Sequence, residues 1–136
     1  MEFVVDASVA IKWVLKEPHQ AEARRLLESG DDMCAPDLLL LEAAGALARH
    51  VRLKQLDAVE AAGAFVRLEM QPLRLEESTP LVPSALRLAL ELSHAADDCV
   101  YLALALELDT TVVTADLRFV AACVRGGYGP HVQSLA

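Results

Sequence analysis

Four acidic residues of this sequence stand where an α/β protein commonly carries its chemistry. Asp6 follows a short apolar run, and Asp116 follows a run of β-branched residues. Glu42 lies inside a leucine-rich helical segment, and Asp98 opens another apolar helix. In a parallel sheet, ligands bind beyond the carboxyl ends of the strands. We therefore expect these four carboxylates to converge at one edge of such a sheet.

Carboxylates that meet in one pocket repel one another unless a cation neutralises them. Mg²⁺ or Mn²⁺ fits this role, because both prefer oxygen ligands and can activate water beside a phosphoryl group. The histidines show no zinc-binding spacing and are expected to be structural or to face solvent; they are His19, His50, His94 and His131. The three cysteines lack any Cys-x-x-Cys pair, which is typical of reduced, buried thiols.

Each acid also has a simpler structural interpretation. Asp6 and Asp116 can cap the helices that follow them. Asp97 and Asp98 suit the amino-terminal end of a helix, and Glu42 can face solvent. These readings stay open for every acid taken singly, whereas the joint pattern of the four acids favours a shared site.

Composition limits the kind of protein. The chain has 136 residues, 54% of them hydrophobic, which predicts a single domain over residues 1–136 with a well-filled core. No apolar stretch approaches the roughly 20 residues of a membrane span, and no export signal opens the sequence, so we expect a cytoplasmic protein. The net charge of −8 opposes broad nucleic-acid affinity, but a bound cation reverses the charge locally.

Hydrophobic periodicity predicts strands that alternate with helices. Strands are expected near residues 2–5, 33–35, 72–75, 110–114 and 131–134. Helices are expected over about 19–28, 36–52, 57–69, 81–93, 97–108 and 117–124, with one or two short ones over 9–15. This alternation favours an α/β fold in which a parallel sheet lies between two helical layers.

Four segments resemble, in order and spacing, the signature blocks of PIN-domain proteins, and in particular of the VapC toxin ribonucleases. They are residues 5–9, 36–42, 96–105 and 113–116. The resemblance implies a PIN-like three-layer α/β/α fold with a five-stranded parallel sheet. It also implies a Mg²⁺- or Mn²⁺-dependent endoribonuclease, a homodimer, and inhibition by a VapB-like antitoxin.

The same resemblance assigns roles to individual residues. Asp6, Glu42, Asp98 and Asp116 match the family's acidic quartet. Ser8 and Thr114 match hydroxyl positions beside it, where they can hydrogen-bond a carboxylate or a water. An aromatic residue commonly precedes the third acid, whereas this chain has Asp97; Asp98 is preferred because it keeps the spacing to Tyr101.

The hypothesis is in-line attack of a metal-activated water on an RNA phosphodiester. Asp6 and Asp98 are the principal ligands, and Glu42 and Asp116 bind the metal or orient water. The positive charges expected to bind the RNA backbone are those of Lys12, Lys16, Arg49, Arg52 and Lys54. The basic residues in 49–54 are explained equally well as cations that stabilise the carboxyl end of a helix. The alternatives are a PIN nuclease that processes RNA outside a toxin–antitoxin pair, and an inactive acidic binding module.

Overall fold

Five parallel strands form the centre of the computed structural model, which describes residues 2–136. Their order across the sheet is β3-β2-β1-β4-β5. Their bounds are Glu2–Val5 (β1), Asp32–Pro36 (β2), Arg74–Glu76 (β3), Val112–Thr114 (β4) and Val132–Ser134 (β5). Strand β1 is central, and its residues 3–5 are buried, as expected for an apolar run in a sheet covered on both faces. The predicted five-stranded parallel sheet is confirmed.

Helices cover both faces of this sheet. The α-helices are Ala7–Ala10 (α1), Gln20–Glu28 (α2), Leu38–Arg52 (α3), Ala58–Glu69 (α4), Val82–Leu92 (α5), Ala96–Glu107 (α6) and Leu117–Arg125 (α7). Three short 3-10 helices are Ile11–Trp13 (η1), Thr79–Leu81 (η2) and Gly129–His131 (η3).

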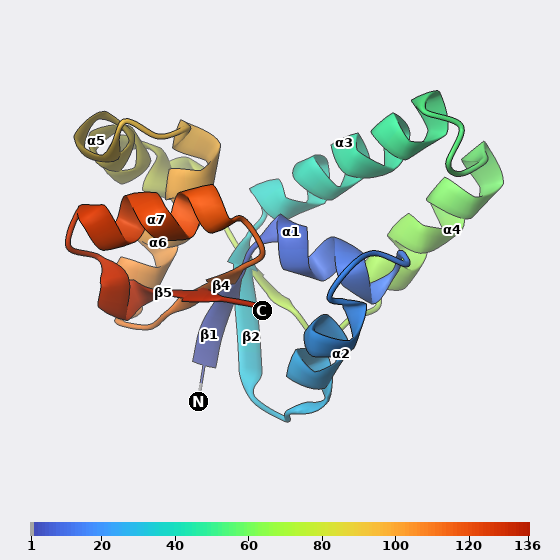
Figure 1. Ribbon diagram of the computed structural model, residues 1–136, viewed down its shortest axis with the longest axis horizontal. Coiled ribbons are helices and arrows are strands. Elements are labelled where there is room, and N and C mark those ends of the chain that lie inside the picture. Colours follow the sequence, from blue (N-terminus) through green and yellow to red (C-terminus); the bar gives the residue numbers. More distant parts are fainter. Residues whose placement is uncertain (1) are drawn as a thin grey trace.

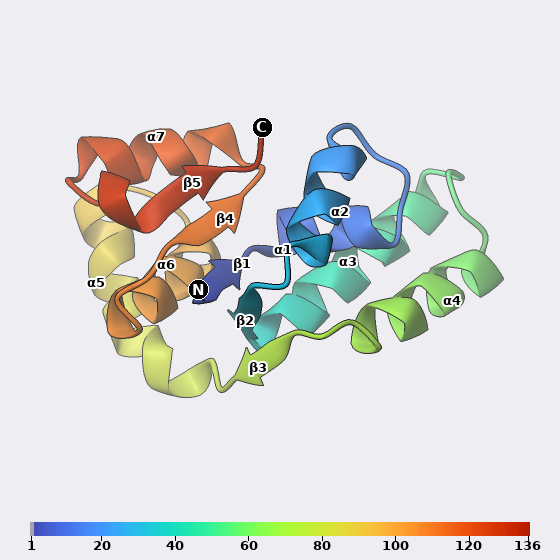
Figure 2. The same cartoon turned by 90° about the horizontal axis from the view of Figure 1, so that it is seen from below.

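The direction of strand addition explains the two helical layers. The chain proceeds from β1 through β2 to β3 and then crosses back over β1 to reach β4 and β5. Right-handed crossovers place α1–α4 on one face and α5–α7 on the other. Figure 2 shows the strands running between these two groups of helices. The α/β, three-layer α/β/α architecture expected from the sequence is therefore present.

The predicted start of the helix after β2 was wrong. Pro36 was expected in the first turn of a helix, but it ends β2, where it pairs with Glu76 of β3. The backbone N–H of Asp37 continues this pairing by donating to the Glu76 carbonyl at 2.7 Å. Helix α3 starts at Leu38, whose N–H donates to Ser78 Oγ at 2.9 Å. A cap supplied from 40 residues away leaves no local signal in the sequence.

The interior is apolar around helix α6, which packs on β1, β2 and β4. Its residues 99–105 are all buried. The three cysteines are buried and free, as expected. Among residues 2–136, no helix combines the length and apolar character needed to cross a bilayer.

The carboxyl edge of the sheet is where the helices begin. Val5 and Val113 lie opposite each other near the ends of β1 and β4, so the two chain segments leave the sheet side by side. The first turns of α1, α3 and α7 gather above this edge in Figure 1. Helix amino termini carry partial positive charge, which favours the acidic side chains placed there.

Candidate metal centre

Asp6 is the most deeply placed acid at this edge. It is only 6% exposed, and its Oδ2 accepts hydrogen bonds from Thr114 Oγ1 at 2.9 Å, from the Ser8 N–H at 3.3 Å and from the Ser8 hydroxyl. Burial raises the pKa of Asp6, the two hydroxyls oppose the rise, and the charge of Asp98 adds to it. The carboxylate is therefore oriented by hydrogen bonds on one oxygen only.

Asp116 repeats this arrangement after β4. It is the N-cap of α7, and its Oδ1 accepts the N–H groups of Arg118 at 3.0 Å and Phe119 at 3.3 Å. Its own N–H donates to Thr114 Oγ1 at 3.1 Å, so Thr114 connects Asp116 to Asp6. The capping interpretation is correct for Asp6 and Asp116, and it leaves one oxygen of each carboxylate available.

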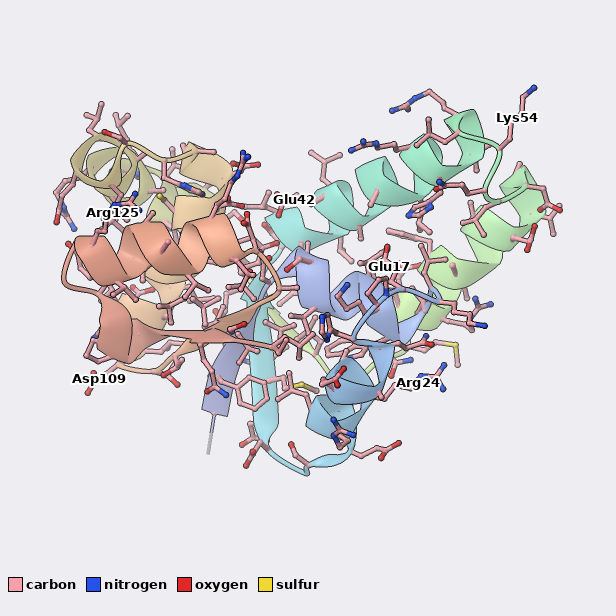
Figure 3. The ribbon with its side chains drawn as sticks, viewed as in Figure 1. Glu17, Arg24, Glu42, Lys54, Asp109 and Arg125 are labelled. Atoms are coloured by element: carbon pink, nitrogen blue, oxygen red, sulfur yellow. The ribbon has the colours of Figure 1, made fainter. Side chains whose placement is uncertain are left out.

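Glu42 is only partly exposed, whereas the simpler interpretation expected it to face solvent. It lies in the first turns of α3 (Figure 3), is partly buried, and accepts a hydrogen bond from Tyr101 Oη at 2.5 Å. Burial raises its pKa to about 7; the Tyr101 hydrogen bond opposes this rise, while the charges of Asp6, Asp97 and Asp98 reinforce it. Glu42 therefore lies within electrostatic reach of the other acids.

The adjacent acids Asp97 and Asp98 have different surroundings. Asp98 is partly buried, and its Oδ2 lies 2.7 Å from His94 Nε2. Burial raises the pKa of Asp98, His94 opposes the rise, and the charge of Asp97 adds to it. Asp97 is exposed, and its Oδ1 accepts the Asp98 N–H at 3.0 Å. This geometry favours Asp98 as the third acid, with Asp97 at the rim.

Two groups of possible ligand atoms share Asp98. His94, Asp98 and Asp116 have one ligand atom each within 4.8 Å of one another, and so do Glu42, Asp97 and Asp98. Asp6 belongs to neither group, although its charge acts on Glu42 and the charge of Asp98 acts on it. The structure thus places Glu42 and Asp116 each near Asp98, in two groups that share this residue, and keeps Asp6 more deeply buried.

The donor set fits a hard divalent cation. Asp6, Glu42, Asp98 and Asp116 each have one oxygen held by a hydrogen bond, while the other accepts none from residues 2–136. No buried side-chain oxygen or nitrogen in that range lacks a partner, so the free oxygens must reach solvent. Carboxylate oxygens that are fixed on one side and open on the other are ligands suited to Mg²⁺ or Mn²⁺.

Two residues at the site were not recognised from the sequence. His94 was expected to be structural or to face solvent, yet it contacts Asp98, and its ring lies 5.2 Å from that of Phe119. The spacing of four residues between His94 and Asp98 was a usable signal. In the sequence, Tyr101 was used only as the residue whose spacing identifies Asp98. Its hydrogen bond to Glu42 connects α6 with α3, so no local sequence pattern predicts this contact.

The basic residues expected to bind RNA are not at this edge. Lys12 is buried and pairs with Glu17 at 3.1 Å. Lys54 lies at the opposite end of α3 from Glu42 in Figure 3, and the last turn of α3 is basic, as its carboxyl end favours. The nearer cation is Arg118, in the first turn of α7. It lines a surface pocket with Ser93, His94, Ala95 and Arg125, the last of these at the other end of α7.

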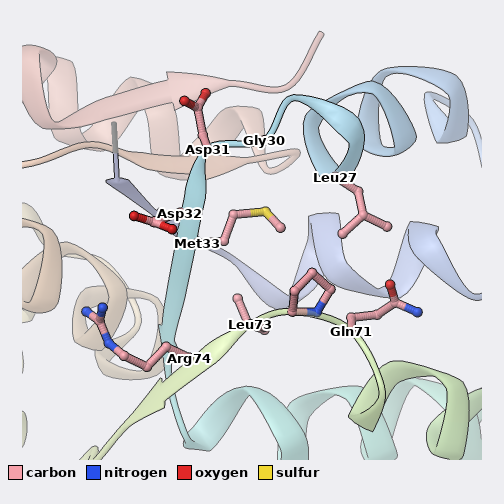
Figure 4. A pocket seen from close by; sticks show the side chains of 9 residues that line it. Leu27, Gly30, Asp31, Asp32, Met33, Gln71, Leu73 and Arg74 are labelled. Carbon is pink, nitrogen blue, oxygen red and sulfur yellow. The ribbon is translucent and has the colours of Figure 1, made fainter.

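A second surface pocket lies at the other end of the sheet. Figure 4 shows Asp32 and Met33, at the start of β2, facing Leu73 and Arg74 around β3. Arg74 is already paired with Glu2 and Glu76. This pocket is at the amino edge of the strands, so it is separate from the acids at the carboxyl edge.

Comparisons with known proteins agree with this fold. The chain is similar to PAE2754 from Pyrobaculum aerophilum, with a TM-score of 0.74 and 22% identity over 99% of this chain and 90% of that one. It is also similar to VapBC2 from Rickettsia felis bound to a promoter DNA fragment (TM-score 0.67) and to a toxin–antitoxin complex from Klebsiella pneumoniae (0.66). Both matches are 13% identical and cover 98% of each chain.

Sequence comparison gives the family. No curated protein matches the chain. The family model for the PIN domain, however, matches residues 3–124, which is most of the sequence and includes the four acids described above. This chain belongs to the PIN-domain family.

Proposed function

We propose that this chain is a Mg²⁺- or Mn²⁺-dependent endoribonuclease and the toxin of a toxin–antitoxin pair. The observation that carries the proposal is the set of four carboxylates at the carboxyl edge, each with one oxygen fixed and one free. PIN domains are generally nucleases, which supports phosphodiester hydrolysis. The acids then serve to bind cations beside the scissile phosphate.

Each acid has a part in the proposed mechanism. A bound cation would supply activation of water and stabilisation of the negative charge that develops on the phosphoryl group. Asp6 and Asp98 would hold it, with Asp6 oriented by Ser8 and Thr114. Asp116 would complete the ligand set or orient water.

Glu42 is suited to handle a proton. In the cation-free site its pKa is raised to about 7 by burial and by the neighbouring acids, so this carboxylate has a higher proton affinity than an ordinary glutamate. Tyr101 holds one of its oxygens at 2.5 Å, so the other is presented to the site. No protein nucleophile is needed, because water would attack the phosphorus while the P–O bond to one ribose breaks and that ribose oxygen takes up a proton.

Arg118 and Arg125 are the proposed contacts for the RNA backbone. They line the pocket that also includes His94; Arg118 is in the first turn of α7, next to its N-cap Asp116, and Arg125 is in the last turn. Both side chains are exposed. A guanidinium group binds phosphate through paired N–H donors, which would hold the strand on the α7 side of the site.

The partner proposal rests on the two complexes to which the fold is similar, VapBC2 and the Klebsiella toxin–antitoxin pair. In this chain an apolar groove lies between α3 and α4, lined by residues such as Leu47, Val51 and Phe65. An amphipathic antitoxin helix would fit this groove. Glu42 lies on the same helix as Leu47 and Val51, so an arginine from the antitoxin could reach the acids and displace the cation.

A homodimer is proposed from helix α5. Val82, Leu86 and Leu90 are spaced four residues apart and are 52%, 56% and 74% exposed. One helix face that exposes three large apolar side chains favours association with an identical face, because a two-fold contact uses the same patch twice.

The deciding experiment is RNA cleavage by Asp6→Asn with Mn²⁺ present. We expect at least a ~100-fold loss of rate, because the neutral amide removes a ligand without changing side-chain size. Asp109→Asn is the matched control: this exposed aspartate has a φ of 50°, which asparagine tolerates, and Figure 3 places it far from Glu42. Cleavage by folded Asp6→Asn at the wild-type rate would overturn the proposal.

A further inference from the structure

His94 stands out as the one nitrogen donor among the acids that the structure gathers within residues 2–136. One of its ring nitrogens lies within 4.8 Å of carboxylate oxygens of both Asp98 and Asp116. The three residues come from two segments, since His94 and Asp98 lie on either side of the start of α6 and Asp116 precedes α7. We propose that His94 is a direct ligand of the cation, so that the site binds a transition-metal ion such as Mn²⁺ in preference to Mg²⁺.

The position of the ring supports this role. His94 is only 16% exposed and packs against Phe119 with the ring centroids 5.2 Å apart. It follows Ser93, whose φ of 51° ends α5 in the left-handed region. The ring is therefore held at the site before any cation binds, which lowers the entropy lost on coordination.

The proton on the ring has a defined place in both states. A carboxylate only accepts hydrogen bonds, so Nε2 of His94 donates to Asp98 Oδ2 at 2.7 Å. To bind a cation through Nε2, the neutral ring would carry its proton on Nδ1 and offer the Nε2 lone pair. Asp98 Oδ2 would then lose the N–H group as a partner and be free to bind the same cation.

The nitrogen ligand determines which metal is preferred. Mg²⁺ requires oxygen ligands in near-ideal octahedral geometry, whereas imidazole suits transition metals. A site with only carboxylates would bind both ions through the same oxygens. One imidazole beside Asp98 and Asp116 shifts the balance towards Mn²⁺, and this inference rests on the proposed metal-dependent function.

The test is spectroscopic and uses the full chain. Electron spin echo modulation of bound Mn²⁺ should show a directly coordinated ¹⁴N, and growth with ¹⁵N-histidine should remove that ¹⁴N signal. In His94→Asn the signal should vanish, and Mn²⁺ affinity by calorimetry should fall about tenfold while Mg²⁺ affinity changes less than about twofold. His19→Asn is the control, because its φ of 65° suits asparagine and its side chain is 53% exposed.

The outcomes separate the two proposals. Wild-type chain that binds Mn²⁺ without any ¹⁴N coupling overturns the role of His94 and leaves the nuclease proposal standing. Wild-type chain that binds neither Mn²⁺ nor Mg²⁺ overturns the metal-dependent function itself, and this inference with it. The isotope experiment needs no substitution, so it decides the question even where His94→Asn does not fold.

Discussion

The acidic residues of the site combine a structural task with an available ligand atom. Asp6 and Asp116 each cap a helix, and each does so through a single carboxylate oxygen. Tyr101 and His94 hold Glu42 and Asp98 in the same one-sided way. A capping role therefore does not compete with metal binding, because the hydrogen bond that caps the helix also orients the second oxygen.

Glu42 should make the stability of the protein depend on pH. Its folded-state pKa is raised from 4.5 to about 7, so the folded protein binds a proton that the unfolded chain has already lost. The stabilisation is present at low pH and is lost as pH rises from about 4.5 to about 7. Without divalent cations, the free energy of unfolding should therefore fall across this window, measured by urea denaturation in EDTA.

The variant Glu42→Gln should reduce this fall, because its amide does not ionise. Glu69→Gln, an exposed residue at the end of α4, should keep the wild-type pH dependence. An unchanged pH dependence in Glu42→Gln would show that Glu42 titrates in the same range whether folded or unfolded. The remaining slope would then come from Asp6 and Asp98, whose pKa values are also raised.

Arg118 should contribute to RNA affinity through charge. In an Asp6→Asn background, which keeps the RNA intact, Arg118→Gln should weaken binding. It should also reduce the slope of log affinity against log salt by about 0.7, the value for one single-strand phosphate contact. Lys54→Gln, at the far end of α3, should change neither quantity. A salt slope identical to that of the Asp6→Asn parent would contradict a phosphate contact by Arg118. The basic residues in 49–54 would then be the candidates for binding the RNA backbone.

At the scale of elements, strands and helices could be predicted wherever the cause is local. The apolar run before Asp6 and the capping box of Asp57 and Glu60 lie in contiguous sequence, and both elements form as expected. The start of α3 could not be predicted, because Ser78 caps it from a distant segment. The site divides in the same way. The sequence placed Asp6 and Asp116 at strand ends. The contact of Tyr101 with Glu42 arises only on folding.

Two glycines should respond oppositely to alanine. Gly45 lies inside α3, and an added Cβ would meet open space there, so Gly45→Ala should stabilise the protein by about 0.5–1 kcal/mol. At Gly126 a Cβ would come within 2.2 Å of Leu92 Cδ2, which is buried where α5 ends. Gly126→Ala should destabilise by about 1–3 kcal/mol, as overpacking does. Urea denaturation measures both, and equal stability of Gly126→Ala and wild type would show that Leu92 repacks freely.

At the scale of the whole molecule, charge and apolar surface act on different partners. The net charge of −8 repels a phosphate backbone, so RNA must be held locally by a cation and by the arginines of α7. The same charge repels a second copy of the chain. Self-association therefore has to come from apolar burial, and the exposed residues of α5 offer it.

Substitution on α5 should separate the proposed homodimer. Leu86→Glu and Leu90→Glu each place a charge within the exposed apolar face, so sedimentation equilibrium should find a monomer where the wild type is a dimer. Val59→Glu, on α4 and 81% exposed in the wild type, should leave the dimer intact. Added salt should preserve or strengthen the wild-type dimer, because it screens the repulsion between two acidic chains. A wild-type dimer that dissociates in salt would show that ion pairs hold it together. A dimer that is lost only in Val59→Glu would show that the interface is on α4.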